Sequence, residues 1–392
     1  MGFDIMRAAQ AVSERAIELR RRIHRHPEIG NDEQVTSALI AETLTGLGWE
    51  VARPMGTAVV GLLRGGQPGR TVALRADMDA LRIDEATDLP FSSEVPHMMH
   101  ACGHDVHCAG LLGAAMVLAE HRSEIKGNVK LFFQPDEEGQ GGAARMIQAG
   151  VMEDPRVDAV FGAHVDPELP AGHVGFKYGK MYAASDTFRV VIHGVGCHGA
   201  SPSKGIDAIA IGAQVVSAVQ QIVSRRVAPT DSAVITIGSF HGGSNGNVIC
   251  DRVEIEGILR TLGREMRLEV RRLFTEAVQG ICAAMGAQAE IHLRESHPGI
   301  VNWNESVELA KNTAEQLLGA DKVHIIEVPT MASEDFGCFV QDAPGAFFKI
   351  GVRNEAMDAV YPIHSAKFKA DEAAIPALIA MHVGNVLNFL NA

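Results

Sequence analysis

The sequence predicts an α/β protein built as two domains. Its 392 residues are more than one compact core usually accommodates, and 46% of them are hydrophobic, which excludes a disordered chain. Strand-like runs alternate with helix-like segments in the first half of the chain. This alternation is typical of a mixed, largely parallel sheet flanked by helices. A different order of strands and helices interrupts it in the middle of the chain.

The first domain opens with two helices before the alternation begins. The apolar spacing, the turn residues around Pro68 and the helix-ending Gly48 define its elements. In chain order we expect helices at 4–25 and 34–47, strands at 59–63 and 71–76, a nearly wholly apolar helix at 105–120, and strands at 129–133 and 159–162.

The pattern changes near Tyr182. Beyond it we expect strands at 187–193, 233–240, 251–260 and 288–295, with helices at 208–225 and 264–285. This β-α-β-β-α-β order is that of a ferredoxin-like unit. We therefore place an inserted domain at 183–296. Residues 1–182 and 297–392 are expected to form the first domain, which resumes through 330–335, 346–351 and a helix from Asp371 onward.

Composition excludes several classes of partner. The formal net charge is −13 and no run of Lys or Arg stands out, so nucleic acid is not expected as a partner. The first residues lack the basic and apolar segments of a signal peptide, and no apolar run is expected to reach membrane-spanning length. The six Cys are scattered, which favours free thiols in a reducing cytoplasm. We expect a cytoplasmic protein with no membrane partner.

Thiol and imidazole groups gather just before the apolar helix. Cys102 and His104 flank a single glycine, so a thiolate and an imidazole can approach one metal ion. Taken alone, such a pair is more often a buried Cys in a tight turn with a surface His. His107 and Cys108 compete for the same role one helical turn later, although Cys108 fits core packing better.

Carboxylates follow the predicted strands. Asp77, Asp136, Glu137, Glu138 and His164 each come at or beyond the expected end of a strand, where ligands gather in parallel sheets. Adjacent carboxylates on a loop can divide the work, one binding metal and the other accepting a proton from water. An isolated acidic cluster is more often a solvated loop. The groups together nevertheless point to a metal-dependent hydrolase.

Other polar residues leave alternatives open. Asp77 and Asp79 alternate on an extended segment and are expected to point in opposite directions, either as ligands or as residues that orient a ligating His. His24 and His26 lie at a helix end before Pro27, where a structural capping role is expected. His164 and His364, each taken singly, fit structural or surface positions as well as metal binding.

The ordered motifs resemble the M20 metallopeptidases, in the aminoacylase, hippurate-hydrolase and auxin-conjugate-hydrolase branch. The central motif is His100-Ala101-Cys102-Gly103-His104-Asp105. The resemblance runs nearly end to end and is carried by residues 22–28, 74–81, 100–105, 133–139, 194–200, 247–249, 331–336 and 364–368. So many motifs in the same order make chance similarity implausible.

The resemblance implies a dinuclear metal site and a set of roles. Two divalent ions, zinc or else manganese, cobalt or nickel, would be held by Cys102, His104, Glu138, His164 and His364. Cys102 would take the place of a bridging Asp found in other branches. The ions would polarise an amide carbonyl and acidify a water molecule, and Glu137 would serve as general base and later as acid. His198, reaching over from a partner subunit, would stabilise the oxyanion, and Asn247 and Arg260 would bind substrate.

The resemblance also has departures. They leave the implied ligands and base intact, and several are expected near the acyl or amino-acid pocket, so they bear on substrate choice rather than on the chemistry. The residues that replace the family's usual ones are Ser203, Cys250, His297, Ala332 and Ala366.

Three functions follow as hypotheses. The first is deacylation of an N-acyl-L-amino acid by a homodimeric amidohydrolase. The second is a metallocarboxypeptidase or dipeptidase acting on short peptides, because both reactions cleave an amide next to a free carboxylate. The third is a non-catalytic binding protein on the same fold, which the intact Glu137 and the five candidate ligands disfavour.

Overall fold

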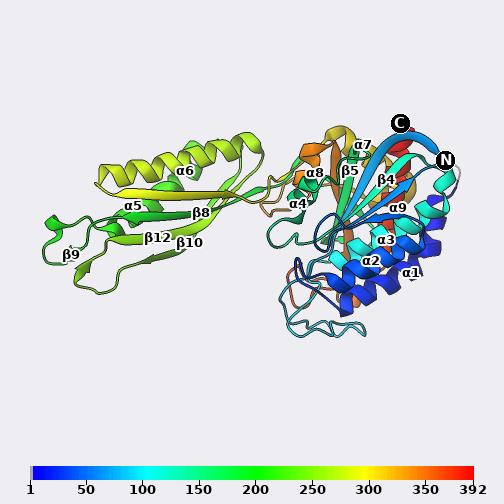
Figure 1. Ribbon diagram of the computed structural model, residues 1–392, viewed down its shortest axis with the longest axis horizontal. Coiled ribbons are helices and arrows are strands. Elements are labelled where there is room, and N and C mark those ends of the chain that lie inside the picture. The colour runs from blue at the N-terminus through cyan, green and yellow to red at the C-terminus, as the bar shows by residue number, and fades with distance from the viewer. Residues whose placement is uncertain (1–2) are drawn as a thin grey trace. The chain divides into compact units, whose positions relative to one another are not determined.

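The computed structural model describes residues 3–392 and divides into two compact units. The first unit comprises the chain up to Gly179 together with Val301–Val328 and Asp335–Ala392. The second unit comprises Lys180–Ile300 and Pro329–Glu334. The predicted insertion at 183–296 falls inside the second unit. Figure 1 labels the elements of both units.

An eight-stranded mixed sheet forms the centre of the first unit. Three consecutive neighbours at its centre, β4, β3 and β5, are parallel, and β16 runs parallel to β5. The consecutive residues Val72 and Ala73, which point to opposite faces of β3, are both fully buried, as expected for a strand covered on both sides. The strand order is β1 (Glu50–Ala52), β2 (Val59–Arg64), β4 (Lys126–Gln134), β3 (Gln67–Asp77), β5 (Ala159–Pro170), β16 (Gly345–Arg353), β6 (Val174–Phe176) and β15 (Val323–Ile325).

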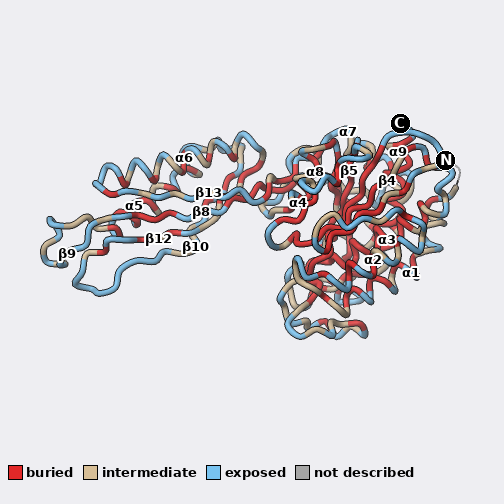
Figure 2. The backbone as a smooth tube through the Cα atoms, viewed as in Figure 1, coloured by how far each residue is buried: buried red, intermediate tan, exposed pale blue. Residues whose placement is uncertain are grey.

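Helices cover this sheet as predicted for an α/β layer. The apolar helix α3 (His104–Glu120) packs against α1 (Ile5–Arg25), α9 (Ala374–Asn391) and β3, while α2 (Gln34–Gly46) packs against β1 and β2. Further helices are α4 (Gly142–Gln148), α7 (Asn304–Leu318) and α8 (Gly337–Asp342), of which α4 and α8 contact each other. Figure 2 shows the strands and α3 as a continuous buried region.

Helix α9 corrects one expectation from the sequence. Its 18 residues have a mean hydropathy of 1.3, which meets the length and composition of a membrane span, although no apolar run was expected to do so. Of this segment, 78% is buried inside the protein, against α1, α3 and α7. It is therefore accounted for as a core helix.

The second unit has the predicted β-α-β-β-α-β order. Its antiparallel sheet runs β10 (Ala233–Gly242), β12 (Arg252–Thr261), β8 (Ala184–His193) and β13 (Gln288–Glu295), and α5 (Ala208–Gln221) and α6 (Arg264–Ala284) pack on it. The predicted helix at 208–225 changes to a π-helical turn at Ile222–Arg226. Two minor sheets complete the fold: β9 (Cys197–His198) pairs with β11 (Val248–Ile249), and β7 (Gly179–Tyr182) pairs with β14 (Ile300–Asn302).

Candidate metal centre

The start of α3 brings a thiol and an imidazole against β5. Gly103, the residue before the helix, has a φ of 81°, and a Cβ there would lie 2.6 Å from the Val165 side chain. Only glycine meets both conditions without strain. The close approach places Cys102 and His104 beside His164, which comes from β5.

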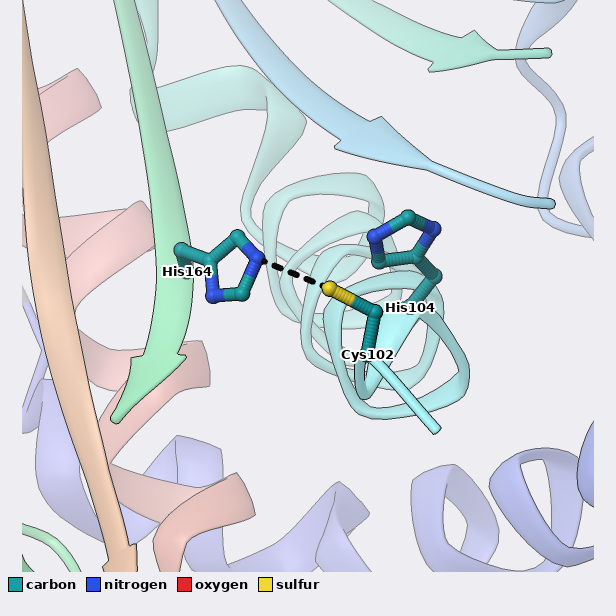
Figure 3. Close-up of side chains that lie close together, drawn as sticks. All are labelled: Cys102, His104 and His164. Atoms are coloured by element: carbon teal, nitrogen blue, oxygen red, sulfur yellow. Dashed lines mark hydrogen bonds between the residues drawn. The ribbon is translucent and has the colours of Figure 1, made fainter. Parts of the chain in front are cut away.

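Cys102, His104 and His164 form the first of two ligand groups. Their candidate ligand atoms all lie within 4.8 Å of one another, and all three side chains are buried. The Cys102 Sγ atom is 3.3 Å from His164 Nε2, as the dashed line in Figure 3 marks. His164 Nδ1 lies 2.8 Å from the Val165 carbonyl oxygen, to which it can donate, so Nε2 is left facing the thiol.

Cys102, Glu138 and His364 form the second group. Their ligand atoms also lie within 4.8 Å of one another, and His364 Nε2 is 3.0 Å from Glu138 Oε1. His364 is held in the left-handed backbone region, at a φ of 64°, and its N–H donates to the Ala101 carbonyl. Cys102 belongs to both groups, which is the position of a ligand shared between two ions.

The residues present fit divalent metal. Zinc binds sulfur at about 2.3 Å and imidazole nitrogen at about 2.1 Å, so two ligands of one ion lie at most about 4.4 Å apart. In both groups the candidate ligand atoms lie within 4.8 Å of one another, which exceeds that limit by no more than a few tenths of an ångström. In addition, the fully buried His104 makes no well-aligned hydrogen bond with the described residues, although the Asp79 and Asp77 carboxylates lie 3.3 and 3.5 Å from its two ring nitrogens. A buried imidazole without a well-formed hydrogen bond is costly, and coordination to a metal would satisfy one ring nitrogen.

Glu137 lies beside both groups. Candidate ligand atoms of His104, Glu137 and Glu138 are within 4.8 Å of one another, and Glu137 is buried. The two neighbouring carboxylates follow β4 on an irregular loop. Glu138 joins the second ligand group, whereas Glu137 belongs to neither ligand group that contains Cys102.

The protonation of the ligands reflects the crowding of negative groups. Hydrogen bonds to Cys102 and Glu138 raise the pKa of His364 to about 10. Burial opposes the charged form of His104, but the nearby Asp77 and Cys102 raise its pKa well above the usual value. Burial raises the pKa of the Cys102 thiol, although His104 opposes this. Protons therefore occupy Cys102, His104 and His364 when no metal is bound, and a divalent cation would have to displace them.

Asp77 and Asp79 both lie near His104, which corrects the expectation that they point in opposite directions. Asp77 Oδ2 is 3.5 Å from His104 Nε2, and Asp79 Oδ1 is 3.3 Å from Nδ1. Strand β3 ends at Asp77, so the alternation does not extend to Asp79. Neither carboxylate belongs to a ligand group that contains Cys102. His164 differs from its expected place as well, because it lies within β5 rather than at the end of a strand.

The competing candidates have other partners. His107 Nδ1 lies 2.5 Å from Asp77 Oδ1, and its Nε2 accepts a hydrogen bond from the Val165 N–H. Cys108 is fully buried, and its Sγ donates to the Asp77 carbonyl oxygen. His24 is also buried and hydrogen-bonds Asp105 and Glu85. His26 ends α1, as predicted for a capping position.

A buried arginine organises the strand ends and was missed by sequence reasoning. Arg75 has no exposed side-chain surface and donates to Gln134, Asp77 and Asp335. Asp335 also accepts from Gln134 Nε2 and from the Ala143 N–H. These bonds tie the ends of β3 and β4 to the segment before α8. The sequence could have revealed this role, because Arg75 is a charged residue that directly follows the apolar run Val72-Ala73-Leu74 of a central strand.

The three remaining candidates lie in the second unit. His198, on β9, is exposed, and its Nδ1 accepts a hydrogen bond from the Ala200 N–H. Asn247 is next to it in space, since its carbonyl oxygen accepts from the Gly199 N–H. Arg260 lies near the other end of β12, paired in register with Ser185 and Val234. Its Nη1 atom is buried without a hydrogen-bond partner among the described residues, and burial lowers its pKa.

The chain is similar to several characterised proteins along nearly its whole length. It is 41% identical over 380 residues to Thermostable carboxypeptidase 1 of Saccharolobus solfataricus, covering 96% of this chain and 95% of that protein. It is 43% identical over 304 residues to the N-acyl-L-amino acid amidohydrolase of Geobacillus stearothermophilus, covering 77% and 82%. With N-acetyl-L-cysteine deacetylase of Bacillus subtilis it shares 39% identity over 362 residues, covering 92% and 84%.

Solved structures and a family model agree with these relatives. A dinuclear metal-binding peptidase of the M20 family from Bacillus subtilis has a TM-score of 0.85 and 34% identity, covering 97% of this chain and 99% of that one. Residues 73–388 match the model of peptidase family M20/M25/M40. The chain is therefore a hydrolase of C–N bonds with the mixed α/β fold predicted above, and it belongs to peptidase family M20/M25/M40.

Proposed function

We propose that this protein is a dinuclear metal-dependent amidohydrolase that removes the acyl group from N-acyl-L-amino acids. The observation that carries the proposal is the buried Cys102, which is common to two groups of candidate ligands, with the carboxylate of Glu137 beside them. The relatives named as amidohydrolase and deacetylase support the substrate class. The mixed thiolate, imidazole and carboxylate ligands favour zinc, with manganese, cobalt and nickel as alternatives.

The proposed ligands divide between the two ions according to their grouping. Cys102, His104 and His164 would hold one ion, and Cys102, Glu138 and His364 the other. When bound, the ions supply a Lewis acid for the amide carbonyl and lower the pKa of water. Glu137 accepts the proton of the attacking water and returns it to the leaving amine.

The proposed lid residues act on the substrate from the second unit. His198 donates a hydrogen bond to the oxyanion, Asn247 binds a substrate carbonyl, and Arg260 binds the carboxylate of the amino acid through its guanidinium. The unpartnered Nη1 of Arg260 supports this role, because a guanidinium whose donors are unused inside a protein favours an anionic partner.

The positions of His198 and Arg260 within the second unit support a dimer. His198 pairs with Val248, which precedes β12, whereas Arg260 lies near the far end of that strand. The stretch of β12 from Arg252 to Arg260 alone extends about 26 Å at about 3.3 Å per residue. Figure 1 shows β9 at the tip of the unit. One small substrate cannot contact both residues of the same copy, so we propose that a partner subunit supplies His198.

A second function has its own support. The 41% identity to a thermostable carboxypeptidase, over 96% of the chain, favours cleavage of short peptides at a free carboxylate. The same ligands and base serve both reactions. The two functions differ in the group on the acyl side of the scissile bond.

A substrate panel with measured metal content tests the proposal. We expect the zinc-loaded protein to hydrolyse N-acetyl- and N-benzoyl-amino acids faster than dipeptides of the same C-terminal residue. Faster cleavage of dipeptides would assign the carboxypeptidase function instead. Complete absence of turnover by protein that contains two ions per subunit would leave only a non-catalytic binding role.

A complementation experiment tests the partner's contribution. Mixing His198→Ala protein with Glu137→Gln protein creates heterodimers in which one site has an intact Glu137 and an intact His198 from the other chain. We expect partial recovery of activity in verified heterodimers. No recovery would assign His198 to the site of its own chain.

We also propose a cytoplasmic location. All six cysteines are free thiols, which supports a reducing compartment. Fractionation of cells that express the full chain, followed by assay of N-acyl-amino-acid hydrolysis, checks this location.

A further inference from the structure

The loop that carries Glu137 begins at a residue with an unusual backbone conformation. Asp136 has a φ of 57°, in the left-handed region that non-glycine residues rarely adopt. Both its main chain and its side chain make hydrogen bonds. Its carbonyl oxygen accepts from the Gly141 and Gly142 N–H groups, and its Oδ2 accepts from the Gln140 N–H at 3.2 Å and from Arg145 Nη2 at 2.6 Å.

The backbone N–H of Asp136 is held by a carboxylate from a distant part of the chain. Glu33, at the start of α2, accepts this N–H through Oε1 at 3.0 Å. Its Oε2 is 2.5 Å from the Thr57 hydroxyl, which donates to it. Glu33 and Thr57 are both buried, at 0% and 1% exposure. A buried carboxylate is expensive unless its oxygens are used, and here one of them is used on Asp136.

The Asp136 side chain fits between two chain segments only because each has a glycine beside it. A Cβ at Gly30 would lie 2.2 Å from Asp136 Oδ1, and a Cβ at Gly139 would lie at the same distance from the same atom. Asn31, next to Gly30, accepts from Arg145 Nη1 at 2.8 Å and so joins the same arginine that binds Asp136. The segment between α1 and α2 therefore encloses the Asp136 side chain.

We propose that Asp136 and Glu33 are positioning residues that set the orientation of Glu137. The inference rests on the proposed role of Glu137 as general base. Asp136 is bonded to Glu137 through one peptide unit, so the direction in which the chain leaves Asp136 fixes where the Glu137 carboxylate begins. The ligand Glu138 has a separate anchor, since its N–H donates to Asp79 Oδ2 at 3.0 Å. The two carboxylates are thus held by different bonds.

Replacing Asp136 tests the proposal through kcat. We expect Asp136→Ala to lower kcat roughly tenfold to a hundredfold, because small displacements of a catalytic group cost about that much. KM should stay within about twofold and the content of two ions per subunit should be unchanged. Asp136→Asn should recover most of kcat, because asparagine tolerates a positive φ and its amide oxygen still accepts the Gln140 N–H. Loss of metal from Asp136→Ala would overturn the proposal, because Asp136 would then position the proposed ligand Glu138 rather than Glu137.

Matched variants separate positioning from backbone strain. Asp88 has the same φ of 57° and is exposed, so Asp88→Ala carries a similar backbone penalty and should leave kcat unchanged. Asp136→Gly keeps the left-handed conformation without strain and removes only the side-chain bonds. If Asp136→Gly and Asp88→Ala have equal kcat values, the proposal is wrong. Glu33→Gln, whose amide oxygen can accept the Asp136 N–H, should retain more activity than Glu33→Ala, and equal losses would also contradict it.

A double variant distinguishes this proposal from the proposed function. If Asp136 acts through Glu137, then Asp136→Ala should cause no further loss of kcat in a Glu137→Gln background. An additional tenfold loss there would overturn the positioning role while leaving Glu137 as the base. Full activity of Glu137→Gln alone would instead overturn the proposed function.

Discussion

At the ends of β3 and β4 the first unit buries charged groups and imidazoles, whereas the second unit lays a row of charges along an exposed sheet face. Arg75, Asp77 and His104 have no exposed side-chain surface. On the second sheet, Arg189 pairs with Glu254 at 2.5 Å, yet 45% of the arginine side chain is exposed. Exposed pairs add little stability, while buried polar groups are costly unless every one is held. The buried polar groups of the first unit therefore serve the candidate site, whereas the exposed charges of the second unit serve solubility.

Among these predictions, the largest expected effect is the loss of kcat on replacing the proposed base Glu137 in the first unit. We expect Glu137→Gln to lower kcat by about a hundredfold to ten-thousandfold, the usual contribution of a positioned general base. Metal content should stay near two ions per subunit, because the two groups around Cys102 do not include Glu137. Steady-state kinetics together with elemental analysis checks both. Loss of an ion would reassign Glu137 as a ligand.

The second unit has a buried ion pair of its own, and breaking it should destabilise this unit alone. Asp186 is 1% exposed and accepts from Arg267 Nε and Nη2, both at 2.9 Å, and from Arg271 at 2.7 Å. We expect Asp186→Ala to lower the free energy of unfolding by about 3–5 kcal/mol, because it leaves the buried Arg267 only the more distant, exposed Glu295 as a counter-charge. Chemical denaturation with metal analysis provides the measurement. Because the ligands belong to the first unit, binding of metal should persist, and metal loss at low denaturant would contradict the independence of the units.

The shared thiol is the next point at which the buried centre can be weakened. We expect Cys102→Ser to weaken zinc binding by at least about tenfold to a hundredfold, because a neutral alcohol is a poor ligand compared with a thiolate. Competition with a chelator gives the two dissociation constants. Ser201→Ala, at a partly buried position of the second unit, serves as a control for loss of a small polar group. Unchanged binding in Cys102→Ser would remove Cys102 from the ligands.

The smallest expected effect concerns stability as a function of pH. Burial raises the pKa of Glu33 to about 7, above its ordinary 4.5. Between these values the folded protein binds the proton more tightly than the unfolded chain, so this group lowers stability as pH rises from about 4.5 to about 7. Glu33→Gln should remove that loss and make the protein more stable above pH 7 by about 1–3 kcal/mol. Unfolding free energies at pH 5 and pH 8 check the sign, and an unchanged slope would contradict it.

Much of this architecture follows from local pattern. The apolar run of α3 and the alternating strands of the second unit are readable because periodicity is a property of neighbouring residues. The short strands β1, β6 and β15 and the helix α7 were not expected. The short strands have too few residues to show a period, and α7 follows a segment with no strong start signal.

The sequence named the candidate ligands that the structure brings together, but it did not predict how they are arranged. The resemblance named Cys102, His104, Glu138, His164 and His364, and the structure brings these five together in two groups. It could not show that Asp77 and Asp79 converge on His104, because that depends on where β3 ends. The Glu33 contact with Asp136 joins residues about a hundred positions apart, and no local pattern reports it.

The discontinuous first unit sets an order of events during synthesis. Strand β5, which carries His164, pairs with β16, and α3 packs against α9. Neither contact can form until the whole of Lys180–Ile300 has been synthesised. At about 5–20 residues per second that delay is on the order of ten seconds. During this delay the apolar surface of α3 is not yet covered by α9, and the edge of β5 is not yet paired with β16. The nascent chain should therefore need a chaperone most at this stage, and the proposed metal site can be complete only after His364 has emerged.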